Sequence, residues 1–307
     1  MLPASECYNE NIAYNSRLVY LWRLFTVFLK LEKIFLVMIF TLFFTNHAYG
    51  ETPPPLTRSN FTPVLMYHDI RMQVSNDFDV STEDFEKQLD WLAANDYKTL
   101  SLDEYIDCAL NKKKFPKKSV LITFDDGYSG IYKYAVPELR KRNMHAVFFV
   151  IRDLLGTELP PDEHTAKYDY ITREQVKTLS QDPLFSIGSH TNTHSMPHQL
   201  SLLQLANEYF ESKKSIEDLT GKPCKAFAFP VGYYDKDLLR LVKKADYVLA
   251  FSVSDLGLLD QEARYSIPRI YMGVVMGQKN MKLFKYSLEN YHKLPKKIFA
   301  ERFKWLD

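Results

Sequence analysis

The sequence predicts an α/β fold with a largely parallel β-sheet, and three observations support this. From Ser119 onward, short apolar runs alternate with stretches of helical periodicity. The apolar runs are nearly continuous, as in strands that are buried on both faces of a sheet. Aspartate or histidine side chains, which can bind metals and transfer protons, directly follow several of these runs. In parallel folds such residues gather at the carboxyl edge of the sheet, where the chemistry takes place.

The first 50 residues are expected to lie outside this fold. Lysines precede the apolar run 34–44, and small residues follow it up to Gly50. This pattern is typical of a secretory signal peptide that is cleaved after Gly50, and the run is short for a membrane span. Residues 18–29 are also largely apolar, so two alternatives stay open: a start downstream of Met1, or an uncleaved membrane anchor over 18–44. We therefore expect an exported protein, in the periplasm or at the cell surface.

The rest of the chain is long enough for one large domain. Residues 51–60 contain a run of three prolines and are expected to form a linker. We expect a single domain over 61–280, followed by a C-terminal extension over 281–307 that packs on the domain or trails from it. We expect a monomer.

The N-terminal part of the domain carries one strand and two helices. Residues 63–69 form a short apolar run with a polar end, which predicts a strand. The segment Ser81–Asp84 has the pattern of a capping box, and apolar residues at helical spacing follow it. Residues 101–110 predict a second, short helix.

From Ser119 the alternation is regular. Apolar runs predict strands at 119–124, 145–151, 184–189, 224–229 and 247–252. Helical spacing predicts helices at about 130–142, after a cap at Thr172, at 199–219 with a stop at Gly221, and at 235–244. Residues 152–171 are expected to form a long loop.

Charge and cysteine content exclude some functions and leave others open. The chain has 39 Lys+Arg against 38 Asp+Glu and no basic stripe, which argues against nucleic-acid binding. Cys108 and Cys224 are the only cysteines after the leader. Two cysteines do not make a disulfide framework, and whether they pair is left open.

Two segments together predict a metal centre. Asp125 and Asp126 end the run 119–124, and His190 and His194 follow the run 184–189. One carboxylate and two imidazoles bind a divalent cation and leave positions for water and substrate. With Asp126 as the carboxylate ligand, Asp125 is free to act as a base toward the attacking water. This set predicts a metal-assisted hydrolase. Zinc is the first choice, and cobalt, nickel and iron also suit the ligands.

These residues resemble the polysaccharide deacetylases, the NodB homology domain of carbohydrate esterase family 4. Thr123-Phe-Asp-Asp-Gly127 matches the first family motif and His190-Thr-Asn-Thr-His194 matches the second. The resemblance covers about 61–275. It implies a distorted (β/α) barrel with fewer than eight regular units. It also implies that Asp125 is the base and that the other three side chains hold the metal.

The third motif departs from the common family pattern. Phe227-Ala-Phe-Pro-Val-Gly232 has Ala228 where most members have an arginine. This variant, with Leu65-Met-Tyr-His-Asp69, resembles the branch that deacetylates poly-β-1,6-N-acetylglucosamine of biofilm matrix. By that resemblance the backbone N–H of Val231 helps to form the oxyanion hole. Arg269 is a candidate to replace the missing arginine and to orient Asp125, with a structural ion pair as the alternative.

The remaining site residues are less well determined by the sequence. We favour His68 as the general acid, with His198 as its rival, because a late family histidine has no clear counterpart and His292 is isolated. A structural role is the alternative for His68 and His198. Tyr128, Phe229 and Pro230 are expected to contact the substrate.

The leading hypothesis is an exported, metal-dependent N-deacetylase that acts on poly-β-1,6-N-acetylglucosamine and releases acetate. Peptidoglycan and chitin oligosaccharides are alternative substrates. A catalytically silent glycan-binding module on the same barrel is an alternative of another class. A non-haem iron oxygenase would use the same ligand types, but such sites usually lie on antiparallel barrels.

Overall fold

The computed structural model describes residues 62–110, 112–159, 168–253, 263–273 and 281–290. The expected leader, the linker and most of the C-terminal extension lie outside these residues, so the expected domain boundaries stay predictions. Within the described residues, no helix combines the length and the apolar character needed to cross a membrane.

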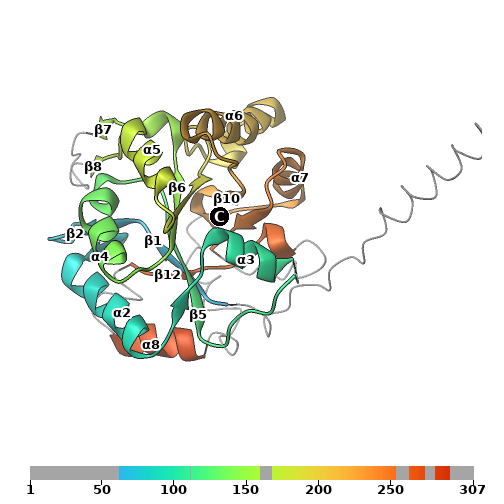
Figure 1. Cartoon of the computed structure of the whole chain (residues 1–307). Coiled ribbons are helices and arrows are strands. Elements are labelled where there is room, and N and C mark those ends of the chain that lie inside the picture. Colours follow the sequence, from blue (N-terminus) through green and yellow to red (C-terminus); the bar gives the residue numbers. More distant parts are fainter. Residues whose placement is uncertain (1–61, 111, 160–167, 254–262, 274–280, 291–307) are drawn as a thin grey trace, which may run out of the picture. The chain divides into compact units, whose positions relative to one another are not determined.

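A parallel sheet of eight strands forms the centre of the fold (Figure 1). Its order is β11-β10-β9-β6-β5-β1-β12, with β4 beside β5, and every pairing is parallel. The strands are β1 (Val64–Tyr67), β4 (Lys98–Thr99), β5 (Ser119–Phe124), β6 (Ala146–Val150), β9 (Phe185–Ser189), β10 (Ala226–Ala228), β11 (Leu249–Phe251) and β12 (Ile270–Tyr271). The predicted parallel α/β architecture is therefore confirmed.

One late segment joins the two edges of this sheet. Ile267 forms a parallel bridge with Phe251 of β11, and the Ser252 N–H donates to the Ile267 carbonyl at 2.8 Å. Three residues later, Ile270 pairs with Leu65 of β1. Since β11 and β1 both bond to the short stretch 267–270, the sheet curls into the distorted (β/α) barrel that the resemblance implied.

The helices lie around the outside of the sheet (Figure 1). Serine, threonine or aspartate side chains cap α2, α3, α5, α6 and α7, which explains where these helices begin. The helices are α2 (Thr82–Ala94), α3 (Leu102–Ala109), α4 (Val136–Lys141), α5 (Arg173–Gln181), α6 (Leu202–Thr220), α7 (Lys236–Lys244) and α8 (Met281–Glu289).

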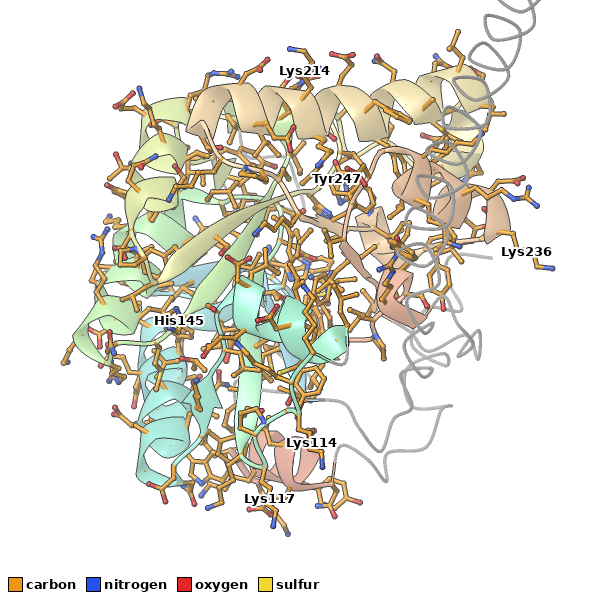
Figure 2. The ribbon with its side chains drawn as sticks, turned by 45° about the vertical axis from the view of Figure 1, so that its right-hand side comes forward. Lys114, Lys117, His145, Lys214, Lys236 and Tyr247 are labelled. Carbon is orange, nitrogen blue, oxygen red and sulfur yellow. The ribbon has the colours of Figure 1, made fainter. Side chains whose placement is uncertain are left out.

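The core lies between this sheet and its helices. Figure 2 shows Tyr247 inside the fold below α6, whereas Lys214 of α6 points outward. The Tyr247 hydroxyl donates to the Tyr209 carbonyl at 3.0 Å, so the buried polar group is satisfied. Cys108 and Cys224 are both buried and free, which answers the question of their pairing.

Several element boundaries differ from the sequence-based expectations. The strand expected over 63–69 is interrupted at His68, and β2 (Asp69–Arg71) pairs instead with β3 (Asp79–Ser81). The loop expected over 152–171 contains β7 (Glu158–Leu159) and β8 (Tyr168–Asp169), which pair antiparallel. A π-helical turn over Ile131–Ala135 precedes α4. These pieces are too short to produce a periodic pattern.

Gly188 of β9 provides a test of the packing between strands. An added Cβ would lie 2.5 Å from the Phe149 ring and 3.0 Å from the Ala226 carbonyl oxygen. We expect Gly188→Ala to lower the free energy of unfolding by about 2–3 kcal/mol, because the core is overpacked. Gly221→Ala is the control, since its φ of 67° is strained but no atom lies within 4 Å. There we expect a loss of about 1 kcal/mol. Urea unfolding measures both, and an equal loss in the two variants would contradict close packing at Gly188.

Candidate metal centre and active site

The ends of four strands meet around one cavity. Asp125 and Asp126 follow β5, His190 follows β9, Val231 lies just beyond β10, and His68 follows β1. All five line a cavity of ≈ 200 Å³. The sequence predicted this meeting, because parallel strands bring their carboxyl ends to one edge.

Asp126, His190 and His194 have the geometry of a metal site. The Asp126 Oδ1 atom lies 3.3 Å from His190 Nε2 and 3.6 Å from His194 Nε2. Ligand atoms around a tetrahedral zinc lie about 3.4 Å apart, because each is about 2.1 Å from the ion. Oδ1 is also a buried oxygen that has no hydrogen-bond partner within the part of the chain that the structure describes. Such an atom is costly unless a cation binds it. The three side chains therefore fit a divalent metal.

The environment of His190 prepares one of its nitrogens for metal binding. Its Nδ1 lies 2.8 Å from the Ala228 carbonyl oxygen, so the ring donates there and presents Nε2 to the centre. Burial lowers the pKa of His190, but the charges of Asp125 and Asp126 outweigh this effect and raise it overall. Burial and the neighbouring His190 lower the pKa of His194. Ala228 thus contributes to the site through its backbone carbonyl.

The backbone is strained around the cavity. Asp126, Thr191, His194 and Val231 have φ values of 68°, 69°, 59° and 51°. Residues other than glycine rarely adopt this region, and a β-branched residue such as Val231 does so least readily. Strain of this kind persists where the surrounding structure fixes it, and it clusters at functional sites.

Arg269 forms a two-pronged ion pair with Asp125. Its Nη1 donates to Asp125 Oδ1 at 2.7 Å and its Nη2 to Oδ2 at 2.6 Å. Its Nε donates to the Ser252 carbonyl at 3.1 Å, and the side chain is fully buried. Burial alone would raise the pKa of Asp125, but the Arg269 charge brings it below the ordinary value. Asp125 is thus held as a carboxylate, with Oδ2 4.0 Å from His190 Nε2.

The two candidate acids lie in different surroundings. His68 lines the cavity, and its Nδ1 is buried without a hydrogen-bond partner among the described residues. Burial lowers its pKa, against the opposing charges of Asp126 and Asp125. His198 is exposed and lies in the short turn Pro197–Gln199, and it does not line the cavity. The position therefore favours His68. His292 lies outside the described residues.

The expected substrate contacts are only partly at the cavity. Tyr128 and Phe229 line it, whereas Pro230 is buried and does not. Tyr128 packs against Tyr168 and Tyr170, with ring centroids 4.7 and 5.1 Å apart. Burial and the charge of Asp126 raise the pKa of Tyr128, so its hydroxyl keeps its proton.

The sequence analysis did not identify some of the residues that line the cavity. Phe78 and Tyr271 pack against the His68 ring, with centroids 5.3 and 5.8 Å away. Both are aromatic residues in short or irregular segments of a chain rich in aromatics, so no pattern distinguished them. The remaining cavity-lining residues that were missed are Met66, Gly232 and Val253.

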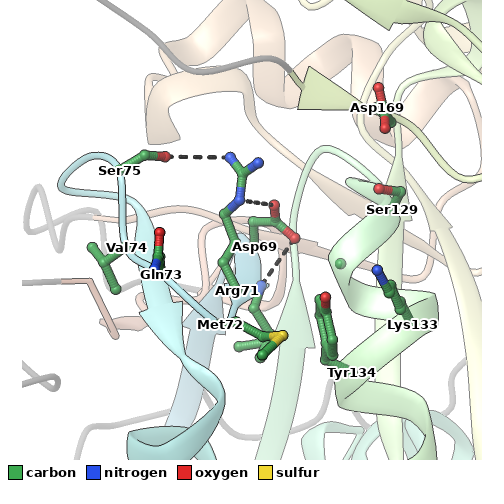
Figure 3. A pocket seen from close by; sticks show the side chains of 12 residues that line it. Asp69, Arg71, Met72, Gln73, Val74, Ser75, Ser129, Lys133, Tyr134 and Asp169 are labelled. Atoms are coloured by element: carbon green, nitrogen blue, oxygen red, sulfur yellow. Dashed lines mark hydrogen bonds and ion pairs between the residues drawn. The ribbon is translucent and has the colours of Figure 1, made fainter.

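A larger hollow of ≈ 700 Å³ is lined by Asp69 and the segment that follows it (Figure 3). Asp69 Oδ1 accepts from the Ile70 N–H at 2.9 Å, and Oδ2 lies 3.7 Å from Arg71 Nε. Burial raises the pKa of Asp69 to about 7 despite the Arg71 charge. Among the described residues, the lining of this hollow contains no group of three side chains placed to bind a metal, in contrast to the smaller cavity.

Known proteins share this fold and these motifs. A polysaccharide deacetylase family model matches residues 112–250. YxkH of Bacillus subtilis, named as a polysaccharide deacetylase, is 31% identical over 208 residues, covering 68% of this chain and 70% of YxkH. The poly-β-1,6-N-acetyl-D-glucosamine N-deacetylase of Staphylococcus aureus is 29% identical over 233 residues, covering 73% of this chain and 78% of that enzyme.

Solved structures agree with this comparison. The Streptococcus pyogenes deacetylase PplD, solved in complex with acetate, superimposes with a TM-score of 0.62 at 25% identity, over 78% of this chain and all (100%) of PplD. IcaB from Ammonifex degensii has a TM-score of 0.60 at 23% identity, over 69% of this chain and 92% of IcaB, and supports the fold. On the match to YxkH and the family model, the chain belongs to the polysaccharide deacetylase family.

Proposed function

We propose that this chain removes the N-acetyl group from an exported N-acetylglucosamine polymer and releases acetate. The observation that carries the proposal is the pairing of a three-ligand metal site with a separate buried carboxylate, Asp125, beside it. Poly-β-1,6-N-acetylglucosamine is the preferred polymer, because the staphylococcal enzyme named for that substrate is 29% identical. The variant third motif supports the same choice.

Asp126, His190 and His194 would hold the cation, with zinc the first choice and cobalt, nickel or iron as alternatives. When bound, the cation polarises the acetamido carbonyl and lowers the pKa of water. The chain's own groups do the rest. Asp125 accepts the proton of the attacking water, and Arg269 fixes the orientation of its carboxylate.

The oxyanion requires a hydrogen-bond donor and the leaving amine requires a proton donor. Both donors must face the bound substrate. The Val231 N–H is proposed to donate to the oxygen that becomes negative as water adds to the carbonyl carbon. His68, in its protonated form, is proposed to donate a proton to the sugar nitrogen as the carbon–nitrogen bond breaks, since it lines the cavity and its Nδ1 has no hydrogen-bond partner among the described residues. Acetate and a cationic glucosamine unit are the products. Tyr128 and Phe229 are proposed to contact the sugar.

Export, a membrane tether through the N-terminus and a monomeric state belong to the same proposal. Export and the tether rest on the leader pattern and on the proposed polymer, which lies outside the cell. We propose no nucleic-acid partner, because the charge is balanced.

Two alternatives have observations in their favour. The absence of the common motif-three arginine would suit a silent glycan-binding module, but Arg269 takes a place beside Asp125. Peptidoglycan or chitin oligosaccharides would place the same acetamido group in the site. The parallel sheet argues against an oxygenase.

Acetate release from defined polymers tests the function. We expect turnover on poly-β-1,6-N-acetylglucosamine oligomers above that on chitin oligomers or peptidoglycan. Asp125→Asn should lower kcat by about 10²–10⁴-fold, because the base is lost while the metal ligands stay. Glycan binding without turnover by the unmutated protein would favour the silent module. Turnover on peptidoglycan alone would contradict the polymer assignment.

Metal removal is a second test. Dialysis against a chelator should abolish acetate release, and added Zn²⁺ or Co²⁺ should restore it, because the three ligands form a single centre. Metal content before and after dialysis is measured by mass spectrometry. Full activity in protein free of metal would contradict the proposed mechanism.

Arg269→Met tests the buried ion pair. It leaves Asp125 charged without a partner, and we expect a loss of about 3–5 kcal/mol in the free energy of unfolding at pH 7. The double variant Asp125→Asn/Arg269→Met should recover part of this loss, and urea unfolding measures both. The low folded-state pKa of Asp125 contributes stability above its unfolded pKa, and this is lost as pH falls through the folded pKa. The difference between unmutated protein and Arg269→Met should therefore shrink in acid, and a constant difference would contradict the ion-pair account.

A further inference from the structure

The loop that carries both histidine ligands is irregular and needs external support. His190 and His194 flank Thr191, Asn192 and Thr193, which form neither helix nor strand. Thr191 and His194 both have positive φ, at 69° and 59°. Irregular buried backbone requires partners for its N–H groups, and strained residues require neighbours that hold them.

Helix α6 supplies those partners through Glu208. Its Oε2 accepts the N–H of Asn192 at 2.8 Å and the N–H of Thr193 at 2.9 Å. Its Oε1 accepts the Thr193 hydroxyl at 3.0 Å. Two consecutive backbone N–H groups that converge on one point form an anion-binding concavity. Here the protein fills that concavity with its own buried carboxylate.

The two histidine ligands depend on this contact to different degrees. The backbone of His190 is fixed by β6, since its N–H donates to the Val150 carbonyl at 2.9 Å, and its ring is fixed by Ala228. The backbone N–H of His194 donates only within the loop, to Thr191 Oγ1 at 3.0 Å. The position of His194 therefore follows the loop. The N–H groups of Arg152 and Asp153 fix the carbonyls of Thr191 and Asn192 at 3.2 and 2.9 Å, and the Asn192 side chain donates to the Asn207 carbonyl at 3.0 Å. Glu208 is the group that fixes the N–H side of the loop, nearest to His194.

We propose that Glu208 is a positioning residue for the metal centre, which holds the loop so that His194 completes the ligand set. The carboxylate makes charge-assisted hydrogen bonds, which are stronger than those of a neutral group or water. This inference rests on the metal centre of the proposed function, but not on the identity of the polymer.

Three variants separate positioning from general stability. Glu208→Ala removes the three hydrogen bonds that the Glu208 side chain accepts from the loop. Glu208→Gln keeps one oxygen for the two amides, and its new amide group can donate to the Thr193 hydroxyl. Glu217→Ala is the matched control on the same helix, because Glu217 Oε1 accepts the Cys224 N–H and the Lys213 ammonium, both at 2.9 Å.

The measurements report Co²⁺ binding and the backbone of the loop, and they do not depend on acetate release. Co²⁺ affinity is measured by competition with a chromophoric chelator, and the visible spectrum of bound Co²⁺ reports its ligands. We expect Glu208→Ala to weaken Co²⁺ binding by about 10–100-fold and to change the spectrum. Glu208→Gln should recover most of the affinity. Glu217→Ala should lower thermal stability and leave affinity and spectrum unchanged.

Amide hydrogen exchange of the metal-free proteins gives an independent measurement. The amides of Asn192 and Thr193 should exchange faster in Glu208→Ala than in the unmutated protein and in Glu217→Ala. Unchanged exchange together with unchanged Co²⁺ affinity would overturn the proposal. Equal loss of affinity in Glu217→Ala would also overturn it, because the effect would then be general destabilisation. A Glu208 effect on Co²⁺ in a protein that releases no acetate would support the inference while contradicting the proposed function.

Discussion

The buried ion pair between Asp125 and Arg269 is the constraint on which the site depends. The carboxylate of Asp125, beside the candidate metal centre, can accept a proton only if it remains charged, and burial opposes that charge. Arg269 stabilises the charged form of Asp125, because its fully buried side chain donates two hydrogen bonds of 2.7 and 2.6 Å to the carboxylate. Its own Nε is satisfied by the Ser252 carbonyl. Arg269 directly precedes β12, which pairs with β1. The segment that closes the barrel therefore also supplies the positive charge that keeps Asp125 ionised.

Each of the other site residues is fixed by a different element. The Ala228 carbonyl turns the His190 ring, Glu208 holds the loop before His194, and the cavity wall around His68 comes from Phe78 and Tyr271. Four residues of the site have positive φ without being glycine. Strain of about 1–3 kcal/mol per residue is tolerable only in a well-packed fold. The continuous buried strands and capped helices therefore serve the site by stabilising an unfavourable backbone.

Much of the fold and the reactive groups of the site could be predicted from the sequence. The strand at 119–124 and the stop at Gly221 follow from hydrophobic runs and from glycine at a helix end. The motifs with Asp125 and Asp126 and with His190 and His194 consist of residue types that bind metals or act as bases, so their role could be predicted from the sequence. The family resemblance suggested Arg269 as the partner of Asp125, and the structure confirms the contact. Local patterns alone could not show it, since β11 and β1 must first meet the segment around Ile267. A two-residue strand produces no periodicity. Glu208 resembled any polar residue of an amphipathic helix, because only tertiary packing reveals which backbone groups it meets.

The position of the closing segment also has a consequence for the newly synthesised chain. Strand β1, near the start of the domain, pairs with β12, which the ribosome makes about two hundred residues later. Until that stretch emerges, β5 lacks the cation that neutralises its terminal carboxylate, and the sheet has two unpaired edges. Contacts so distant in sequence form late and slowly. A nascent chain that ends before Ile267 would hold Asp125, Asp126 and both histidines but not Arg269, so the buried ion pair at Asp125 forms only after this late segment has been made.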